Sequence, residues 1–188
     1  MGLARRSPRL VARFGWVVGE AEHVADAPML RMDRHGWTWV ARIRDRLIHW
    51  TSLNVKPTQP KIIDSGVPSE LAELKALSPT RGADVTWRCV RRPAGAGFFV
   101  TGDAACVLDP AVSDGVTRAV MSGMLAGHLV VQAIRHPEKE EAAIAAYSDW
   151  VSRTFAHRVA GLTALYDRAF PGWRAHPEFD LNQPDVVA

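Results

Sequence analysis

The chain has 188 residues, which predicts one domain or one large piece of a domain. Its composition, 47% hydrophobic and 23% charged, is that of a globular protein and argues against a disordered chain. The net charge of +3 comes from arginines scattered along the sequence, without the run of like charges that a basic tail has. We therefore expect no nucleic-acid partner.

The cysteines and the apolar segments indicate the cellular setting. Cys89 and Cys106 are the only cysteines, and two isolated thiols form neither a disulfide framework nor a zinc spacing, so we expect reduced cysteines and a cytoplasmic protein. No apolar segment follows the basic residues of the N-terminus, which argues against a signal peptide. The most apolar stretch, residues 116–134, contains an arginine and a histidine and predicts a buried helix, not a membrane span.

The first half of the chain is expected to be mainly extended. Ser7 followed by Pro8 has the pattern of a helix N-cap with proline at the first helical position, which predicts a short helix to about Phe14. Residues 23–34 are expected to be extended. Apolar and polar residues alternate in the two segments that follow, 36–43 and 47–53, which predicts a hairpin carrying Trp37, Trp39 and Trp50.

The second half is expected to be mainly helical. The proline-bearing residues 54–65 predict a loop, and Pro68 predicts the start of a helix to about Leu77. In chain order, the later segments predict a strand over 84–92, a turn over 93–97, a buried strand over 98–101, a helix over 115–135 ended by His136-Pro137, an amphipathic helix over 138–170 and a frayed polar tail.

The segment between the last expected strand and the first long helix has the chemistry of a ligand site. Gly102 lets the chain turn and lets a ligand approach the backbone closely. Asp103 follows at the carboxyl end of the strand, where α/β sheets place ligands, and its carboxylate can accept hydrogen bonds from hydroxyl groups. Asp109-Pro110 is a rigid turn that leads to Gly115, where the N-terminus of the helix favours an anion. A polyol with an anionic ring, such as reduced flavin, matches these features.

The same segment resembles the second FAD motif of the flavin-dependent monooxygenase, geranylgeranyl reductase and tryptophan halogenase superfamily. The resemblance rests on Gly102-Asp103-Ala104-Ala105, Asp109-Pro110, Ser113-Asp114-Gly115-Val116, Ala119, Ser122-Gly123 and Ala126. It implies that Asp103 holds the ribityl hydroxyls of FAD, and that Gly102, Pro110, Gly115 and Val116 lie against the cofactor. Asp114 stands where the family commonly has a small neutral residue, and we expect it to cap the helix.

Two other segments are similar to the same superfamily. Gly36-Trp37-Thr38-Trp39 with residues 46–53 is similar to the tryptophan-rich strand pair of the halogenase-like branch, which implies that Trp37, Trp39 and Arg42 face the substrate. Large aromatic side chains in a hairpin are more often core residues, so a core role is the alternative for both tryptophans. Residues 6–15 resemble the end of the family's middle motif.

The sequence departs from the superfamily in several respects: it lacks the Asp-Gly of the middle motif, the Ile-Pro that follows the tryptophan pair in typical halogenases, and any lysine or glutamate assignable to a halogenase's catalytic roles. It has no G-x-G-x-x-G after a strand, the turn with which the family binds the FAD pyrophosphate. We therefore expect a partial FAD/NAD(P)-binding fold of the α/β class with α+β character, which combines an antiparallel tryptophan-rich substrate-domain sheet with two long C-terminal helices. The expected regions are 1–92 for the partial substrate domain, 93–136 for the FAD motif and 137–188 for the last helix and tail.

The resemblance implies an FAD-dependent oxidoreductase of the monooxygenase or halogenase type, with NAD(P)H as a possible reductant and a small organic molecule as substrate. We assign no catalytic residue and no metal ligands, since His128 and His157 have no partner at metal-ligand spacing. One alternative is a truncated pseudo-enzyme or subunit that needs a complementing chain or a homo-oligomer to bind FAD. A second alternative is a basic, non-catalytic binding module.

Overall fold

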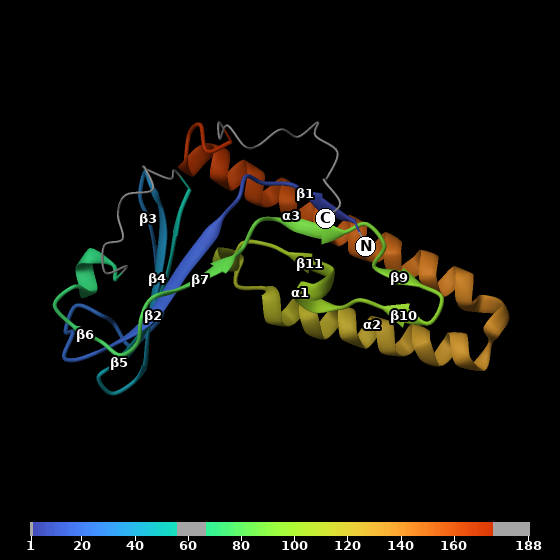
Figure 1. The fold of residues 1–188 in the computed structure, drawn as a ribbon, viewed down its shortest axis with the longest axis horizontal. Helices are drawn as coiled ribbons and strands as arrows, with labels where there is room; N and C mark the ends of the chain where they lie inside the picture. Colours follow the sequence, from blue (N-terminus) through green and yellow to red (C-terminus); the bar gives the residue numbers. More distant parts are fainter. Residues whose placement is uncertain (1, 56–66, 175–188) are drawn as a thin grey trace. The chain divides into compact units, whose positions relative to one another are not determined.

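A computed structural model describes residues 2–55 and 67–174. These residues form two compact units, whose ribbons are drawn in Figure 1. Of the described residues, the first unit contains those up to Pro8 and residues 86–165, and the second contains residues 9–85 and 166–174. The fold is mixed α/β with antiparallel sheets and long C-terminal helices, which confirms the expected class.

The second unit is built on a six-stranded antiparallel sheet. The strand order is β3-β4-β5-β2-β6, and β7 also pairs with β2. Its elements are β2 (Val11–Val18), β3 (Met29–Met32), β4 (Gly36–Arg44), β5 (Leu47–Asn54), the short 3-10 helix η1 (Ser69–Leu71), β6 (Lys75–Ala76) and β7 (Arg81–Asp84).

The tryptophan-rich hairpin predicted from the sequence is confirmed as β4 and β5. Arg46, in the turn between them, has a φ of 58°, in the left-handed region. Alternate residues of these strands and of β2 point into a core under one face of the sheet. That core contains Val17, Ala21, Val24, Val40, Ile48, Trp50 and Leu71.

Two helices predicted in this half of the chain are wrong. Ser7 does not cap a helix, because its hydroxyl donates to the Pro8 carbonyl at 2.8 Å and accepts from the Trp87 N–H at 2.9 Å. The residues after it instead form β2, which the aromatic and β-branched content of that segment favours. Pro68 starts only one turn, η1, because the chain then pairs with β2 as β6.

The first unit combines a small sheet with a pair of long helices. Its antiparallel sheet has the order β1-β8-β11, and β9 and β10 form a separate two-stranded hairpin. Its elements are β1 (Leu3–Arg5), β8 (Arg88–Val90), β9 (Ala94–Gly95), β10 (Phe98–Phe99), α1 (Gly102–Ala105), β11 (Cys106–Val107), η2 (Pro110–Val112), α2 (Gly115–Arg135), η3 (Pro137–Lys139) and α3 (Glu140–Ala169). The end of α3, from Tyr166, belongs to the second unit.

Two expected strands differ from those of the structure, and one expected loop lies mainly outside the described residues. The strand expected over 84–92 is divided into β7 and β8, which belong to different units. The buried strand expected over 98–101 is only the two half-buried residues of β10, paired with β9. The loop expected over 54–65 and the tail lie mainly outside the described residues.

The expectation of two unpaired cysteines is wrong. Cys89 of β8 and Cys106 of β11 are directly opposed in the sheet, their Cα atoms lie 4.1 Å apart, and their sulfur atoms are bonded in the structure. Both residues are buried. The sequence separation of 17 residues gave no local signal for this pairing, which depends on the register of the two strands.

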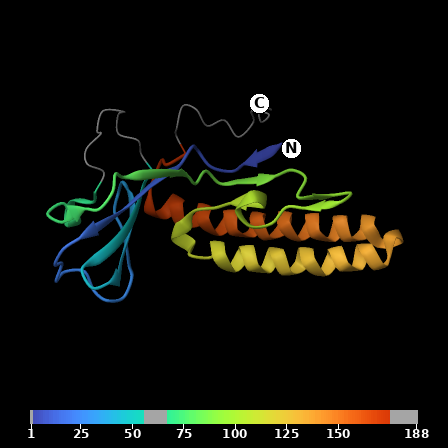
Figure 2. The same ribbon diagram turned by 60° about the horizontal axis from the view of Figure 1, so that its bottom comes forward.

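The two long helices predicted at 115–135 and 138–170 are confirmed as α2 and α3. They lie side by side in both Figure 1 and Figure 2, joined by η3. Tyr147 of α3 anchors this helix to the chain before α1, because its hydroxyl donates to the Val100 carbonyl at 2.7 Å. None of the helices within the described ranges has the length and hydropathy that would cross a membrane.

Candidate functional site

The candidate site lies in the first unit, on α1, η2 and the start of α2, and α1 packs against α2. Gly102 opens α1 with a φ of +59°, a left-handed conformation that favours glycine. A Cβ atom at this position would lie 3.3 Å from the Cβ of Ala119, so glycine also permits the close approach of α1 to α2. The turn predicted from this glycine is present, but Asp103, expected in a loop after a strand, lies in a four-residue helix.

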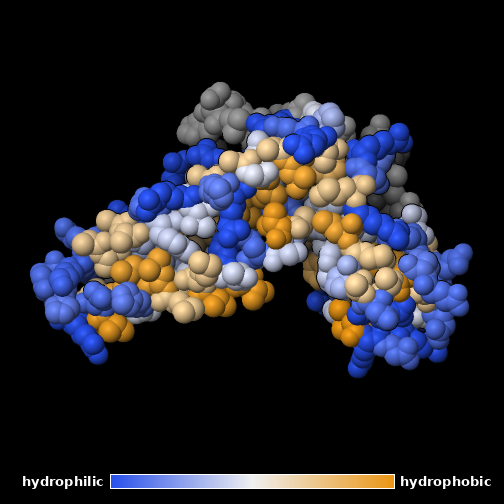
Figure 3. Space-filling view, turned by 180° about the vertical axis from the view of Figure 1, so that it is seen from behind, coloured by the Kyte–Doolittle hydropathy of each residue, from blue (hydrophilic) through white to orange (hydrophobic). Residues whose placement is uncertain are grey.

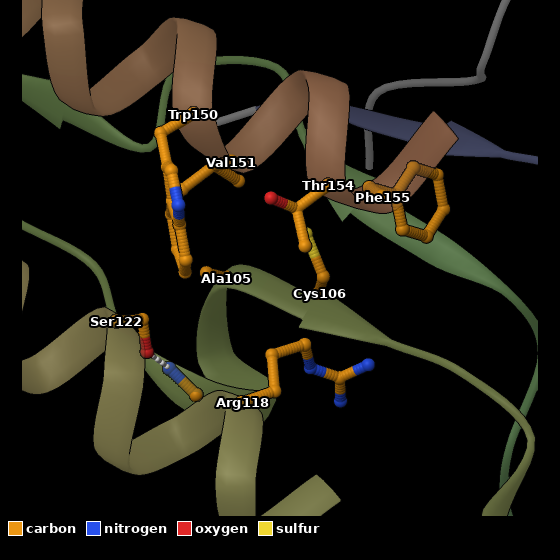
Figure 4. Close-up of a pocket in the computed structure, with 9 residues that line it drawn as sticks. Ala105, Cys106, Arg118, Ser122, Trp150, Val151, Thr154 and Phe155 are labelled. Atoms are coloured by element: carbon orange, nitrogen blue, oxygen red, sulfur yellow. Dashed lines mark hydrogen bonds between the residues drawn. The ribbon is translucent and has the colours of Figure 1, made fainter. Parts of the chain in front are cut away.

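A buried serine of α2 fixes the backbone of this turn. The Ser122 hydroxyl accepts the Gly102 N–H at 3.0 Å and donates to the Ala119 carbonyl, also at 3.0 Å. Figure 4 shows the bond between Ser122 and the backbone nitrogen. The start of α1 is therefore tied to the first turns of α2 by a hydrogen bond as well as by packing.

Asp103 pairs with an arginine that the sequence reasoning did not assign to the site. Its Oδ1 atom accepts from Nη2 of Arg118 at 2.9 Å. The Asp103 side chain is 76% exposed, whereas that of Arg118 is 8% exposed. The Asp103 carboxylate is thus exposed at the surface, and the buried guanidinium of Arg118 fixes one of its oxygens. Such a carboxylate can accept further hydrogen bonds from hydroxyl groups.

The segment from Asp109 to Ser113 turns the chain towards α2. Asp109 is 1% exposed, and its side chain accepts the Ala111 N–H at 2.8 Å, so it caps η2. Pro110 follows at an exposed position, in agreement with the rigid turn that Asp109-Pro110 predicts. Ser113 ends the turn with a φ of 52°.

The N-terminus of α2 is open to ligands. Gly115 and Val116 are exposed, and no atom lies within 4 Å of a Cβ built on Gly115. No side chain caps this end of the helix, so its first N–H groups and their partial positive charge face outward. Asp114 occupies the N-cap position, but its carboxylate forms an ion pair with Arg158 of α3 and not the expected capping bond.

A small cavity lies behind the α1–α2 junction. Its volume is about 20 Å³, which is room for roughly one water molecule. Figure 4 shows side chains of α3 on one side of it and those of α1, β11 and α2 on the other. It is lined by Gly102, Ala105, Cys106, Arg118, Ser122, Trp150, Val151, Thr154 and Phe155. This cavity is too small for a flavin, so the candidate site is the exposed surface in front of it.

The residues expected to face a substrate lie in the second unit, on two faces of its sheet. Trp37 is buried and donates from Nε1 to the Tyr166 hydroxyl at 3.1 Å, as a core residue does. Trp39, two residues further along β4, points to the same face and is partly exposed. Arg42 points to the opposite face, where its Nη2 donates to the carbonyls of Ala21 and Val24.

A histidine that the sequence reasoning missed lies beside Trp39. The ring centroid of His49 is 4.4 Å from that of Trp16, 5.6 Å from that of Trp39 and 6.4 Å from that of Phe14. Burial lowers the pKa of His49 below its ordinary value, because the charged imidazolium is poorly solvated there. This face of the sheet therefore combines aromatic rings with one imidazole whose neutral form is favoured.

Sequence comparison alone gives no relatives: no protein-family model matches the chain, and no curated protein is similar enough in sequence to be matched. Solved structures do match. The myxobacterial chondrochloren halogenase CndH superimposes with a TM-score of 0.77 at 19% identity over 93% of this chain, and the flavin-dependent halogenase CmlS with 0.73 at 18% identity over 95%. The probable FAD-dependent monooxygenase pqsL from Pseudomonas aeruginosa superimposes with 0.67 at 19% identity over 90%.

This chain has the fold of one part of the flavin-dependent halogenases and monooxygenases. It spans 46% of CndH, 37% of CmlS and 51% of pqsL, so it accounts for about half or less of each flavin-enzyme fold. The resemblance seen in the sequence is thereby confirmed at the level of fold.

The five residues that the flavin-enzyme motif predicted for the cofactor lie in three elements of the first unit, two of which, α1 and α2, are in contact. Gly102 and Asp103 lie in α1, Pro110 in η2, and Gly115 and Val116 at the start of α2, and all but the half-buried Gly102 are exposed. No group of three or more histidine, cysteine, aspartate or glutamate side chains that could hold a metal ion occurs within residues 2–55 and 67–174.

Proposed function

We propose that this chain contributes the ribityl- and isoalloxazine-binding half of the flavin site in an FAD-dependent oxidoreductase of the monooxygenase or halogenase type. The observation that carries this proposal is the exposed arrangement at the α1–α2 junction. A carboxylate projects beside the uncapped N-terminus of a 21-residue helix, on a fold shared with flavin-dependent enzymes. The substrate is a small organic molecule, and NAD(P)H or a partner reductase supplies electrons.

The residues present fit the cofactor. Asp103 would accept hydrogen bonds from the ribityl hydroxyls, since its side chain is 76% exposed and already oriented by Arg118. The N–H groups at the start of α2 would stabilise negative charge on the ring, while the ion pair with Arg158 offsets the charge of Asp114. When bound, FAD supplies the redox chemistry. Trp39 with the neighbouring His49 would contact the substrate.

The first test is retention of FAD by the purified chain. We expect flavin absorbance to remain after free cofactor is removed, with about one cofactor per chain if the half-site suffices or an oligomer completes it. Asp103→Asn should weaken FAD binding by about tenfold or more, since it removes a charge-assisted hydrogen-bond acceptor. Asp149→Asn, which alters an exposed carboxylate paired with Arg153 on α3, is the matched control.

A subunit that needs a complementing chain, or a second copy of itself, is the second candidate. It is favoured by the outward face of α2, where apolar side chains have no cover in the structure. Val116, Val120, Met124, Val131 and Ile134 recur at helical spacing along this face and are 81%, 54%, 71%, 47% and 74% exposed. Figure 3 shows hydrophobic side chains along the edge of the helical pair that α2 occupies. An exposed stripe of this kind is typical of an interface.

The absorbance test separates these candidates. If the isolated chain retains no FAD at any oligomeric state but does so with a complementing chain, the subunit interpretation holds. If no flavin is retained in either case, the flavin half-site is overturned. Salt-dependent binding of nucleic acid by the same chain would then favour the basic binding module.

A further inference from the structure

Arg118 occupies a position where a charged residue is costly. It lies in the first turns of α2, and its side chain is only 8% exposed. Arginine is rarely buried unless it is paired, because removing its charge from water carries a large free-energy cost. The guanidinium of Arg118 donates from Nη2 to Oδ1 of Asp103, the residue that would hold the ribityl chain.

The two partners of this ion pair are unequal. The arginine is held inside the first unit, and its aliphatic part lines the small cavity shown in Figure 4. The aspartate projects to the surface with its side chain 76% exposed. The guanidinium is also planar, so its N–H groups point in fixed directions. Arg118 is thus the fixed member of the pair and Asp103 the member whose orientation it sets.

The backbone of Asp103 is tied to the same helix. Ser122 accepts the N–H of Gly102, which precedes Asp103, and Gly102 packs closely against Ala119. Helix α2 therefore fixes both the main chain that precedes Asp103 and the Asp103 carboxylate. The N-terminus of that helix is the proposed subsite for the isoalloxazine ring, so the two subsites share one rigid frame.

We propose that Arg118 is a positioning residue, which holds the Asp103 carboxylate in the orientation that accepts the ribityl hydroxyls and thereby makes the site prefer flavins with a ribityl chain over the bare ring. This inference rests on the flavin site proposed above. It predicts a specific effect when Arg118 is replaced. The site still binds the isoalloxazine ring, but the ribityl chain no longer adds to the affinity.

Riboflavin and lumiflavin provide the test, since both carry the isoalloxazine ring and only riboflavin has the ribityl chain. Dissociation constants are measured by flavin fluorescence for the wild-type chain, Arg118→Met, Asp103→Asn and the double variant. The wild type is expected to bind riboflavin more tightly than lumiflavin. Arg118→Met should reduce that preference by about tenfold, the size expected for a lost hydrogen bond to a charged group. The double variant should lose no more of the preference for riboflavin than either single variant loses, because both changes remove the same interaction.

Two further variants keep the result interpretable. Arg135→Met changes an exposed arginine at the far end of α2 and should leave both dissociation constants unchanged. Arg118→Lys retains the positive charge but not the planar geometry. Arg118→Lys replaces Arg118→Met in the test if the melting curve of Arg118→Met shows that it does not fold. The ratio of the lumiflavin and riboflavin dissociation constants of Arg118→Lys then tests the positioning role, and it should lie between the ratios of the wild type and of Asp103→Asn.

Each contrary outcome has one meaning. If Arg118→Met keeps the wild-type preference while Asp103→Asn loses it, the positioning role is overturned and the flavin site stands. If the wild type binds lumiflavin as tightly as riboflavin, Asp103 does not hold the ribityl chain and the role of Arg118 fails with it. If the wild type binds neither flavin, alone or together with a complementing chain, the proposed function itself fails.

Discussion

Two arginines define the candidate site at the scale of single residues. Arg118 and Arg158 come from different helices; Arg118 pairs with Asp103 of α1, and Arg158 pairs with Asp114 at the N-cap of α2. These partners are distant in sequence, so no local spacing pattern revealed them. Arg118 did give one signal: it is a charge within an otherwise apolar helix, where a charge needs a partner.

The pair between Arg158 and Asp114 leads to a prediction about stability. The Asp114 side chain is 16% exposed, so Arg158→Met would leave a largely buried carboxylate without its cation. We expect this change to lower the free energy of unfolding by about 1–3 kcal/mol. Urea denaturation measures the loss.

The double variant Arg158→Met with Asp114→Asn is the control for this prediction. It should recover most of the lost stability, because the uncompensated charge is removed. Equal stability of Arg158→Met and wild type at neutral pH would show that the ion pair is not formed in solution.

Secondary-structure elements with a single strong pattern were predicted well from the sequence. The helix expected over 115–135 has the bounds of α2, because its apolar periodicity and the following proline both mark it. The hairpin of β4 and β5 was recognised by its alternation and aromatic content.

Elements that depend on partners distant in sequence were not predicted. Ser7 precedes a proline as an N-cap does, but its hydroxyl bonds to Trp87 and the chain becomes a strand. The helix expected from Pro68 is reduced to one turn because the following residues pair with β2. In both segments tertiary pairing overrides the local preference, which a single sequence does not record.

The link between β8 and β11 gives a prediction at the scale of elements. Cys89 and Cys106 close a loop with a sequence separation of 17 residues. Chain-entropy arguments give such a cross-link about 3 kcal/mol of stability. We therefore expect the protein to unfold at a lower temperature after its disulfide is reduced. Without reduction, alkylating reagents should modify no thiol even when the protein is unfolded.

The variant with both cysteines changed to alanine isolates the contribution of the link. Its melting temperature should equal that of the reduced wild type and should not respond to reductant. Detection of two reactive thiols in the unfolded, non-reduced chain would contradict the pairing.

At the scale of the whole molecule, the outward face of α2 predicts association. The apolar stripe from Val116 to Ile134 includes Gly123 and Gly127, and no atom lies within 4 Å of a Cβ built on either glycine. Small residues at this spacing allow a partner to pack closely. We expect the isolated chain to form oligomers by light scattering, or to bind a hydrophobic dye as a monomer.

Replacing Met124 and Val131 by lysine should abolish that association. The melting temperature should change little, because both side chains are already exposed and contribute little to the fold. A wild-type chain that is monomeric and does not bind the dye would show that the stripe is covered within the chain itself.

Each unit is built from segments that are distant in sequence, and this affects when the units can fold during synthesis on the ribosome. Ser7 and Trp87, which bond in the first unit, are 80 residues apart, and Trp37 and Tyr166, which bond in the second, are 129 apart. Both units also contain part of α3, so neither can be completed before that helix has been translated. The nascent chain carries an unfinished sheet through most of its synthesis, the condition in which chains depend most on chaperones.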